Sequence, residues 1–386
     1  MIDRIAKQTL TFLSNQFRAI AVIGPRQSGK TTLVKLVFPN KPYVSLENPD
    51  VRLLAESDPR GFLIEYEQGA IIDEVQRVPE LFNYLQEILD NATEDGMFIL
   101  TDSNNFLIQE NISQTLAGRV GILDLFPFSF REINSIKEHP KKFETLILSG
   151  GYPEIYDRKR EPSVWYQNYI RTYVERDVRQ LLQITNSSSF TRFLKLCAGR
   201  VGQQLNISAL SNLAGIKVDT AKSWLSVLQQ SFVIFLLQPY HQNFNKRLTK
   251  SPKLYFYDSG LACNLLSIKN TNELKLSHFF GGLAENYVIS DIIKNNHHLG
   301  LQNSFYYWRE SNGLEIDLLI EDGSDLSAIE IKAGKTIKDE FFSNLMKFKK
   351  IASVKKSYIL YDGTQKMNWK NEVEIMNWRV FDFPTK

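Results

Sequence analysis

Eight consecutive residues near the start of the chain have the types and spacing of a phosphate-binding loop. They fit the pattern GxxxxGK[ST] and comprise Gly24, Pro25, Arg26, Gln27, Ser28, Gly29, Lys30 and Thr31, with Thr32 next. Gly29 lets the backbone turn so that N–H groups can point at phosphates, and a helix beginning at Lys30 adds partial positive charge. We expect Lys30 to reach the β- and γ-phosphates of ATP and Thr31 to place its hydroxyl on Mg²⁺.

An acidic pair at the end of a second apolar run supplies the complementary chemistry. Asp73 and Glu74 directly follow Ile71 and Ile72. A carboxylate at the end of a strand beside the loop can hold Mg²⁺ through water, so we assign Asp73 to the metal. Glu74 is assigned as the general base that polarises the attacking water. The alternative is an acidic pair that only caps a helix.

Two further groups have two interpretations each. Asp102, Ser103 and Asn104 end another apolar run, where a polar side chain either senses the γ-phosphate or caps the next helix. Arg119 is a candidate arginine finger, and a surface ion pair is the equal alternative.

The C-terminal third contains a different set of charged residues. Glu315 and Asp317 lie two apart and are expected to share one face of a strand, while Leu314, Ile316 and Leu318 face the other side. Glu330 and Lys332 repeat this spacing on a second strand.

These residues form a D…ExK pattern, which is typical of PD-(D/E)xK nucleases. Glu285 lies upstream on a predicted helix. The pattern predicts a metal site of Glu285, Asp317 and Glu330, in which Lys332 helps to activate water together with Glu330. A charged face of an ordinary hairpin gives the same pattern, and such a fold can also bind without cleaving.

The predicted elements place these groups on three regions. Apolar runs alternate with helical stretches up to about residue 160, which predicts an α/β domain with a parallel sheet at 1–160. Residues 161–275 are mostly helical and contain two helices joined by a turn at Gly215, followed by two strands, which suggests a winged-helix domain. Residues 276–386 begin with a helix over 283–294 and continue with strands over 305–309, 314–320 and 326–331.

Composition sets the class of protein. The chain has 386 residues, 43% hydrophobic and 23% charged, with a net charge of +3. This balance excludes a chain that binds nucleic acid through overall charge alone, although a local basic patch remains compatible with it. The cysteines Cys197 and Cys263 are isolated, as in a reducing compartment. The sequence shows no signal-peptide core or membrane-spanning run, so we expect a cytoplasmic protein without a membrane partner and leave its oligomeric state open.

Several motifs together resemble a family of prokaryotic AAA-type ATPases with an uncharacterised C-terminal domain. The motifs are Gly24–Leu33, Ile72–Gln76, Leu116–Val120, Pro127–Phe130, Gly151–Pro153, Tyr173–Val178 and Lys253–Leu261. The resemblance implies an ATPase core, a winged-helix middle and a restriction-endonuclease-like C-terminal domain. The family commonly has a small residue where this chain has Asp102. A carboxylate there would repel the γ-phosphate, so we expect slow hydrolysis or an altered sensor.

The sequence is compatible with three functions. The first is an ATPase that acts on nucleic acid through a nuclease-like domain. The second is a nucleotide-dependent switch whose C-terminal half binds a partner protein. The third is a DNA-binding regulator, but its candidate recognition helix over 219–228 offers only Lys222, which is little for strong DNA binding. Basic residues that could contact phosphates as a wing, or belong to a solvated loop, are Lys246, Arg247, Lys250 and Lys253.

Overall fold

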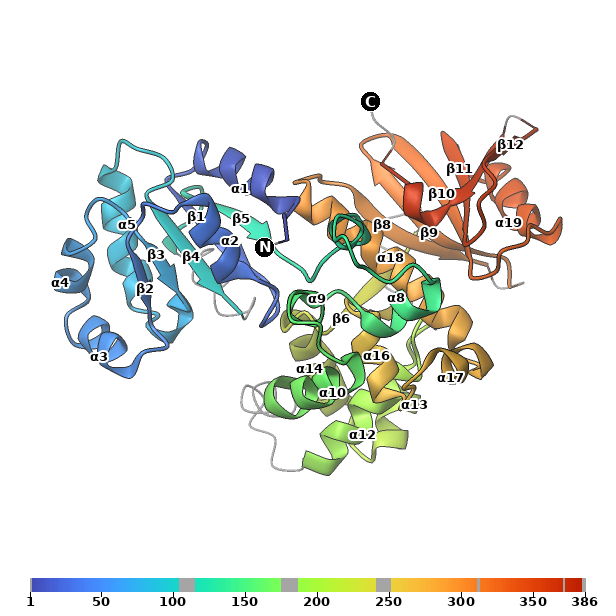
Figure 1. Ribbon diagram of the computed structural model, residues 1–386, viewed down its shortest axis with the longest axis horizontal. Coiled ribbons are helices and arrows are strands. Elements are labelled where there is room, and N and C mark those ends of the chain that lie inside the picture. The colour runs from blue at the N-terminus through green and yellow to red at the C-terminus, as the bar shows by residue number, and fades with distance from the viewer. Residues whose placement is uncertain are drawn as a thin grey trace.

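The computed structural model describes residues 2–103, 115–174, 187–240, 251–310, 313–370 and 372–383. Its N-terminal part, blue to cyan in Figure 1, is built on a five-stranded sheet in the order β2-β3-β4-β1-β5. Neighbouring strands in this sheet pair in parallel, as the sequence predicts. The strands are β1 (Ala19–Ile23), β2 (Tyr43–Ser45), β3 (Ile71–Asp73), β4 (Phe98–Asp102) and β5 (Val120–Asp124).

Helices cover both faces of this sheet, which explains why its central strand is apolar throughout. Ile20 and Val22 of β1 pack with one set of helices, whereas Ala19, Ala21 and Ile23 pack on the opposite face. Alternate side chains of a strand point to opposite faces, so burial on both requires a continuous apolar run. The helices are α1 (Ala6–Ser14), α2 (Lys30–Val37), α3 (Pro49–Ser57), α4 (Pro59–Ile64), η1 (Val75–Arg77) and α5 (Leu81–Asn91).

The helical middle begins earlier than its sequence pattern indicates. Helices from residue 130 onward share one core with the later helices, so packing places the first boundary nearer 130 than 160. These helices are short, and a short helix gives little hydrophobic periodicity to detect. They are α7 (Phe130–Asn134), α8 (Phe143–Ser149), α9 (Pro153–Asp157), α10 (Pro162–Tyr169) and the π-helix η2 (Ile170–Val174).

The expected pair of helices joined at Gly215 is present. Gly215 is left-handed, with φ of 71°, and ends α13 before α14 begins. The following strands β6 (Ile234–Pro239) and β7 (Lys253–Phe256) pair antiparallel. Residues 241–250, which include Lys246, Arg247 and Lys250, lie outside the described residues. The remaining helices here are α12 (Ser187–Ala198), α13 (Ile207–Ala214), α14 (Val218–Gln230), α16 (Ser259–Leu265) and α17 (Thr271–Leu276).

The β6–β7 hairpin joins the C-terminal sheet. β6 pairs parallel with β8, which produces an eight-stranded sheet in the order β12-β13-β11-β10-β9-β8-β6-β7. The middle and C-terminal regions therefore share one sheet across the expected boundary at 275. The C-terminal elements are α18 (Phe280–His298), β8 (Ser304–Arg309), β9 (Glu315–Asp322), β10 (Asp325–Lys332), α19 (Glu340–Lys349), β11 (Lys356–Tyr361), β12 (Met367–Trp369), β13 (Val373–Asn377) and η3 (Trp378–Val380).

Strand β9 departs from simple alternation. We expected Leu318 to share a face with Ile316, but the two belong to different cores. The register between β8 and β9 shifts between Tyr306 and Trp308, which indicates a β-bulge next to Asp317. An extra residue in one strand reverses the facing of the side chains beyond it. The expectation for Leu318 was therefore wrong.

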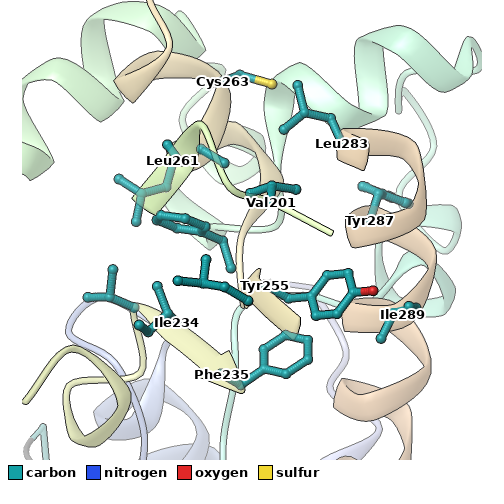
Figure 2. Packing of buried hydrophobic residues seen from close by; sticks show 14 of the residues in the cluster. Val201, Ile234, Phe235, Tyr255, Leu261, Cys263, Leu283, Tyr287 and Ile289 are labelled. Atoms are coloured by element: carbon teal, nitrogen blue, oxygen red, sulfur yellow. The ribbon is translucent and has the colours of Figure 1, made fainter. Parts of the chain in front are cut away.

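Helix α18 lies where the three parts of the chain meet. Figure 2 shows Ile289 of α18 beside Tyr255 of the β6–β7 hairpin and Leu283 of α18 near Cys263, all within one hydrophobic core. Cys197 and Cys263 are buried free thiols. Within the described ranges, no helix is long and apolar enough to cross a membrane.

Candidate functional site

The phosphate-binding loop leaves β1 through a tight turn that requires glycine. Gly24 has φ of 155°, and a Cβ there would lie 2.1 Å from the carbonyl oxygen of Leu125. Gly29 is left-handed, with φ of 95°, and immediately precedes α2. The loop therefore ends at a helix N-terminus, where free N–H groups and partial positive charge favour an anion.

Lys30 lies inside this loop, with only 6% of the residue exposed. Its Nζ donates to the carbonyl oxygens of Gly24 at 2.9 Å and Pro25 at 3.0 Å. Burial lowers the pKa of Lys30, while the carboxylates of Glu74, Asp102 and Asp73 act in the opposite direction. A bound phosphate would favour the charged form of Lys30 and so oppose the effect of burial on its pKa.

Asp73 is held by hydroxyl groups from three other elements. Its Oδ1 accepts from Thr31 of the loop at 3.0 Å and also from Thr101 at the end of β4. Its Oδ2 accepts from the Tyr43 hydroxyl of β2 at 2.8 Å. The predicted proximity of Thr31 and Asp73 is present, and their oxygens are the ligand type that Mg²⁺ prefers. No sequence motif indicated that Tyr43 and Thr101 contact Asp73.

Glu74 lies beside this pair in a left-handed conformation, with φ of 58°. Its Oε2 accepts from Gln76 at 2.6 Å and from Ser103 at 3.1 Å. Asp102 is fully buried at the end of the strand between β1 and β3. Asn104 lies outside the described residues. Ser103 is thus the residue at this strand end that contacts the candidate base.

A cavity of about 840 Å³ opens over the loop. Its walls come both from the loop and from the middle helices, including Tyr169, Thr172 and Tyr173. The Tyr169 hydroxyl donates to the Arg26 carbonyl at 3.4 Å, and the Arg26 guanidinium lies 5.7 Å from the Tyr173 ring centroid. The cavity joins two sequence-distant segments, so no local motif indicated its aromatic wall. Loop and neighbouring residues on its lining are Arg26, Gln27, Gly29, Lys30, Thr31, Thr32 and Glu74.

Arg119 does not approach the loop of its own chain. It directly precedes Val120, which is in register with Ala19 at the start of β1, so it lies at the sheet edge opposite the loop. Its guanidinium forms an ion pair with Asp90 of α5. The surface ion pair, rather than a finger within the same chain, is what the structure contains.

The second group of carboxylates is partly assembled around Lys332. The Lys332 Nζ lies 2.6 Å from Glu330 Oε2 and 3.9 Å from Asp317 Oδ2, so these two oxygens are at most about 6.5 Å apart, the two distances end to end. Asp317 Oδ2 also accepts from the Ile331 backbone N–H at 2.8 Å. Asp317, Glu330 and Lys332 therefore meet as the hairpin turn at Gly323 predicts.

Glu285 forms an ion pair with Lys253, one of the basic residues for which the sequence left a phosphate-contacting wing or a solvated loop open. Lys253 is 1% exposed, and its Nζ lies 3.1 Å from Glu285 Oε1 and also pairs with Glu315. The Tyr255 hydroxyl donates to the same Glu285 oxygen. Lys253 is a buried partner of acids, so both alternatives for it, a phosphate-contacting wing and a solvated loop, were wrong.

The predicted metal arrangement is absent from the part of the chain that the structure describes. There, no group of three or more His, Cys, Asp or Glu side chains is placed to hold a metal ion. Two ammonium groups lie among the carboxylates instead, Lys253 with Glu285 and Lys332 with Glu330. The described residues thus contain the expected neighbours Asp317, Glu330 and Lys332, but Glu285, Asp317 and Glu330 do not form a metal-holding group.

Burial controls the charge state of this cluster. It raises the pKa of Glu285 to about 7 and that of Glu330 to about 8, with further increases from Asp317 and opposing effects from the paired lysines. Lys253 and Lys332 both have a pKa above their usual value, because the surrounding acids outweigh burial. The shifts therefore favour the charged form of both lysines and the protonated form of Glu285 and Glu330.

Comparisons with known proteins find family models that match three segments of the chain. Residues 16–134 match a family model described as an AAA domain, 140–272 one described as Domain of unknown function (DUF8612), and 280–381 one described as Domain of unknown function (DUF4143). The chain is 31% identical over 322 residues to the uncharacterized protein Rv2008c of Mycobacterium tuberculosis, which covers 82% of this chain and 70% of that protein. An uncharacterized protein of Haemophilus influenzae is 20% identical, covering 76% and 78%.

Among solved structures, the Walker-type ATPase paby2304 of Pyrococcus abyssi is similar at a TM-score of 0.46 and 15% identity. The match covers 69% of this chain and 96% of that one.

Proposed function

The chain belongs to the protein family that includes Rv2008c and carries an AAA domain, and we propose that it is a Mg²⁺-dependent ATPase. The observation that carries this proposal is the contact between the Thr31 hydroxyl and Asp73, 3.0 Å apart, beside Lys30 and Glu74. Each of these four residues is of the type that its position in ATP hydrolysis requires.

Phosphate binding, Mg²⁺ binding and proton transfer are assigned to different residues of this chain. The loop N–H groups and Lys30 bind and orient the β- and γ-phosphates. Thr31 and Asp73 would hold Mg²⁺, which supplies neutralisation of charge on the phosphates when bound. Glu74 accepts the proton of the attacking water, and its contacts with Gln76 and Ser103 fix the carboxylate toward the cavity.

Binding and turnover of ATP test this proposal. Calorimetric titration of the full chain with ATP and Mg²⁺ should show binding, and Lys30→Ala should weaken it by at least about tenfold, because the loop loses its cation. Lys195→Ala is the control, since Lys195 is an exposed lysine of α12, a helix that does not line the cavity over the loop. ATP affinity that is equal in wild type and Lys30→Ala would refute the proposal.

We further propose that nucleotide state is passed to the C-terminal region through α18. Near its start, Glu285 pairs with Lys253. At its end, His298 Nε2 accepts from the Phe126 N–H at 3.1 Å, and Phe126 follows the sheet that carries the loop. These two residues lie thirteen apart, roughly 20 Å along one helix.

For the C-terminal region, the lysine-filled cluster favours binding of a partner over cleavage of nucleic acid. Metal-dependent cleavage would require a cation to displace Lys253 or Lys332 from its carboxylate. Incubation of single- and double-stranded DNA with the protein, ATP and Mg²⁺ or Mn²⁺ should therefore give no products. Cleavage that disappears in Glu330→Gln would instead establish the nuclease function.

Binding of nucleic acid is measured separately. Salt-dependent DNA affinity would assign the partner as nucleic acid, and its absence would leave a protein partner.

A further inference from the structure

Tyr43 is an unexpected member of the nucleotide site. It lies on β2, the edge strand, whose register pairs Ser45 with Asp73 of β3. The Tyr43 hydroxyl turns along the sheet edge and donates to Asp73 Oδ2 at 2.8 Å. On its other side, the Lys35 ammonium lies 3.3 Å from the ring centroid. The ring is therefore fixed between α2 and β3 although 38% of the residue is exposed.

The two oxygens of Asp73 have different partners. Oδ1 accepts from Thr31 and Thr101, whereas Oδ2 accepts from Tyr43. A carboxylate has about four acceptor positions, two on each oxygen, so Thr31 and Thr101 fill those of Oδ1, while Oδ2 retains one beside the Tyr43 hydrogen bond. With both oxygens held by hydroxyls from separate elements, rotation of the carboxylate would break at least one hydrogen bond. Tyr43 thus completes the fixation of Asp73.

We propose that Tyr43 is a positioning residue that orients Asp73 toward the nucleotide-bound Mg²⁺ and thereby sets the Mg²⁺ dependence of nucleotide affinity. The inference rests on the proposed ATPase function. Hydrogen bonds to the groups that hold a metal fix their orientation, and their loss commonly costs about 10- to 100-fold in metal affinity. The Tyr43 hydroxyl contacts Asp73 rather than the loop N–H groups or Lys30, so nucleotide affinity without metal is expected to be independent of it.

The hydroxyl keeps its proton over the working range of pH. Burial raises the pKa of Tyr43 to about 12, and the hydrogen bond to Asp73 contributes in the same direction. The hydroxyl is therefore the donor in its hydrogen bond to Asp73.

The test compares Tyr43→Phe with wild type by calorimetric titration of a non-hydrolysable ATP analogue. Titrations in EDTA and at a series of Mg²⁺ concentrations separate the affinity for nucleotide from that for metal. We expect unchanged affinity in EDTA and an apparent Mg²⁺ constant about tenfold weaker in the variant. Tyr66→Phe is the matched control, because Tyr66 packs against Phe62 away from the loop.

A second comparison shows whether the effect passes through Asp73. In a double-mutant cycle, Tyr43→Phe should cause no further loss of Mg²⁺ dependence in an Asp73→Asn background. Equal Mg²⁺ constants in wild type and Tyr43→Phe would overturn the inference while leaving the ATPase proposal intact. A loss of affinity in EDTA as well would show a merely structural role. Absence of nucleotide binding by wild type would instead defeat the proposed function itself.

Discussion

Arg4 Nη1 donates a hydrogen bond to the main-chain carbonyl of Ser28, 2.7 Å away within the phosphate-binding loop. The same guanidinium donates from Nη2 to the Phe126 carbonyl at 2.6 Å and from Nε to Glu132 at 2.8 Å. The loop is therefore anchored by a hydrogen bond from Arg4, which lies twenty positions before Gly24, the first glycine of the loop. Because Glu132 also faces His298 of α18, this contact places the loop in one buried polar group with the C-terminal helix.

The first prediction concerns Glu132, which is 2% exposed. Burial acts to raise its pKa, but Arg4 and His298 outweigh burial and leave the pKa well below the usual 4.5. A depressed folded-state pKa means that the stabilisation is present above about pH 4.5 and is lost as pH falls through the lower folded value. Glu132→Gln should reduce the free energy of unfolding by about 3 kcal/mol at pH 7, since Arg4 remains buried without its charge partner.

Urea unfolding of wild type and Glu132→Gln at pH 7 and pH 4 measures this effect. The difference between the two proteins should shrink at the lower pH. Glu138→Gln is the control, because Glu138 forms an exposed pair with Lys159 and should leave the unfolding midpoint unchanged. A midpoint for Glu132→Gln that equals that of wild type at pH 7 would contradict the prediction.

The elements around the loop were predictable because their patterns are local. The run Ala19–Ile23 is apolar at every position, and the structure has β1 at the same residues. Likewise, an apolar strand ending in Asp73 sufficed to place that carboxylate beside Thr31. Parallel strands bring their carboxyl ends to one edge of the sheet, so type and order of elements were enough.

Other parts of the sites depend on contacts that no local pattern records. Tyr43 reaches Asp73 from a strand thirty residues earlier, and Tyr173 reaches the cavity from the middle helices. Lys253 lies in a basic stretch of sequence, yet β7 buries it against Glu285. A charge pattern alone does not distinguish a solvated basic residue from one that neutralises acids inside the fold. The bulge next to Asp317 was hidden for a related reason, since residue types alternate up to Leu318 and the apolar run Leu318–Ile320 that follows fits burial on either face.

The second prediction concerns Glu74. If it accepts the proton of the attacking water, Glu74→Gln should retain ATP binding but slow turnover by roughly a hundredfold or more. The amide can still accept the hydrogen bonds that Gln76 and Ser103 donate, so the fold should be preserved. Phosphate release under saturating ATP is the measurement, with the exposed Glu80→Gln as control. Turnover at the wild-type rate would remove Glu74 from its role.

The third prediction concerns Asp102, which is fully buried at the end of β4. Its carboxylate opposes the lowering of the Lys30 pKa that burial causes, so the two charges interact. The same carboxylate would repel a γ-phosphate bound at Lys30. Asp102→Asn should therefore tighten ATP binding or raise turnover, on the order of tenfold. Titration calorimetry and phosphate release together measure both quantities, and Asp95→Asn, an exposed site, is the control. No change in either would show that Asp102 is shielded from the nucleotide.

The last prediction concerns the pH dependence that the C-terminal cluster imposes. Burial raises the pKa of Glu330 to about 8, with a further contribution from Asp317, while Lys332 acts in the opposite direction. A raised folded-state pKa means that the stabilisation is fully present below about pH 4.5 and is lost as pH rises through about 8. Wild type in EDTA should accordingly lose stability to urea between pH 6 and pH 9. Glu330→Gln cannot ionise and should lose less over the same interval, whereas Glu321→Gln, on the partly exposed end of β9, should follow wild type. Equal losses in wild type and Glu330→Gln would show that Glu330 is already ionised at pH 6, held by the Lys332 ammonium 2.6 Å away.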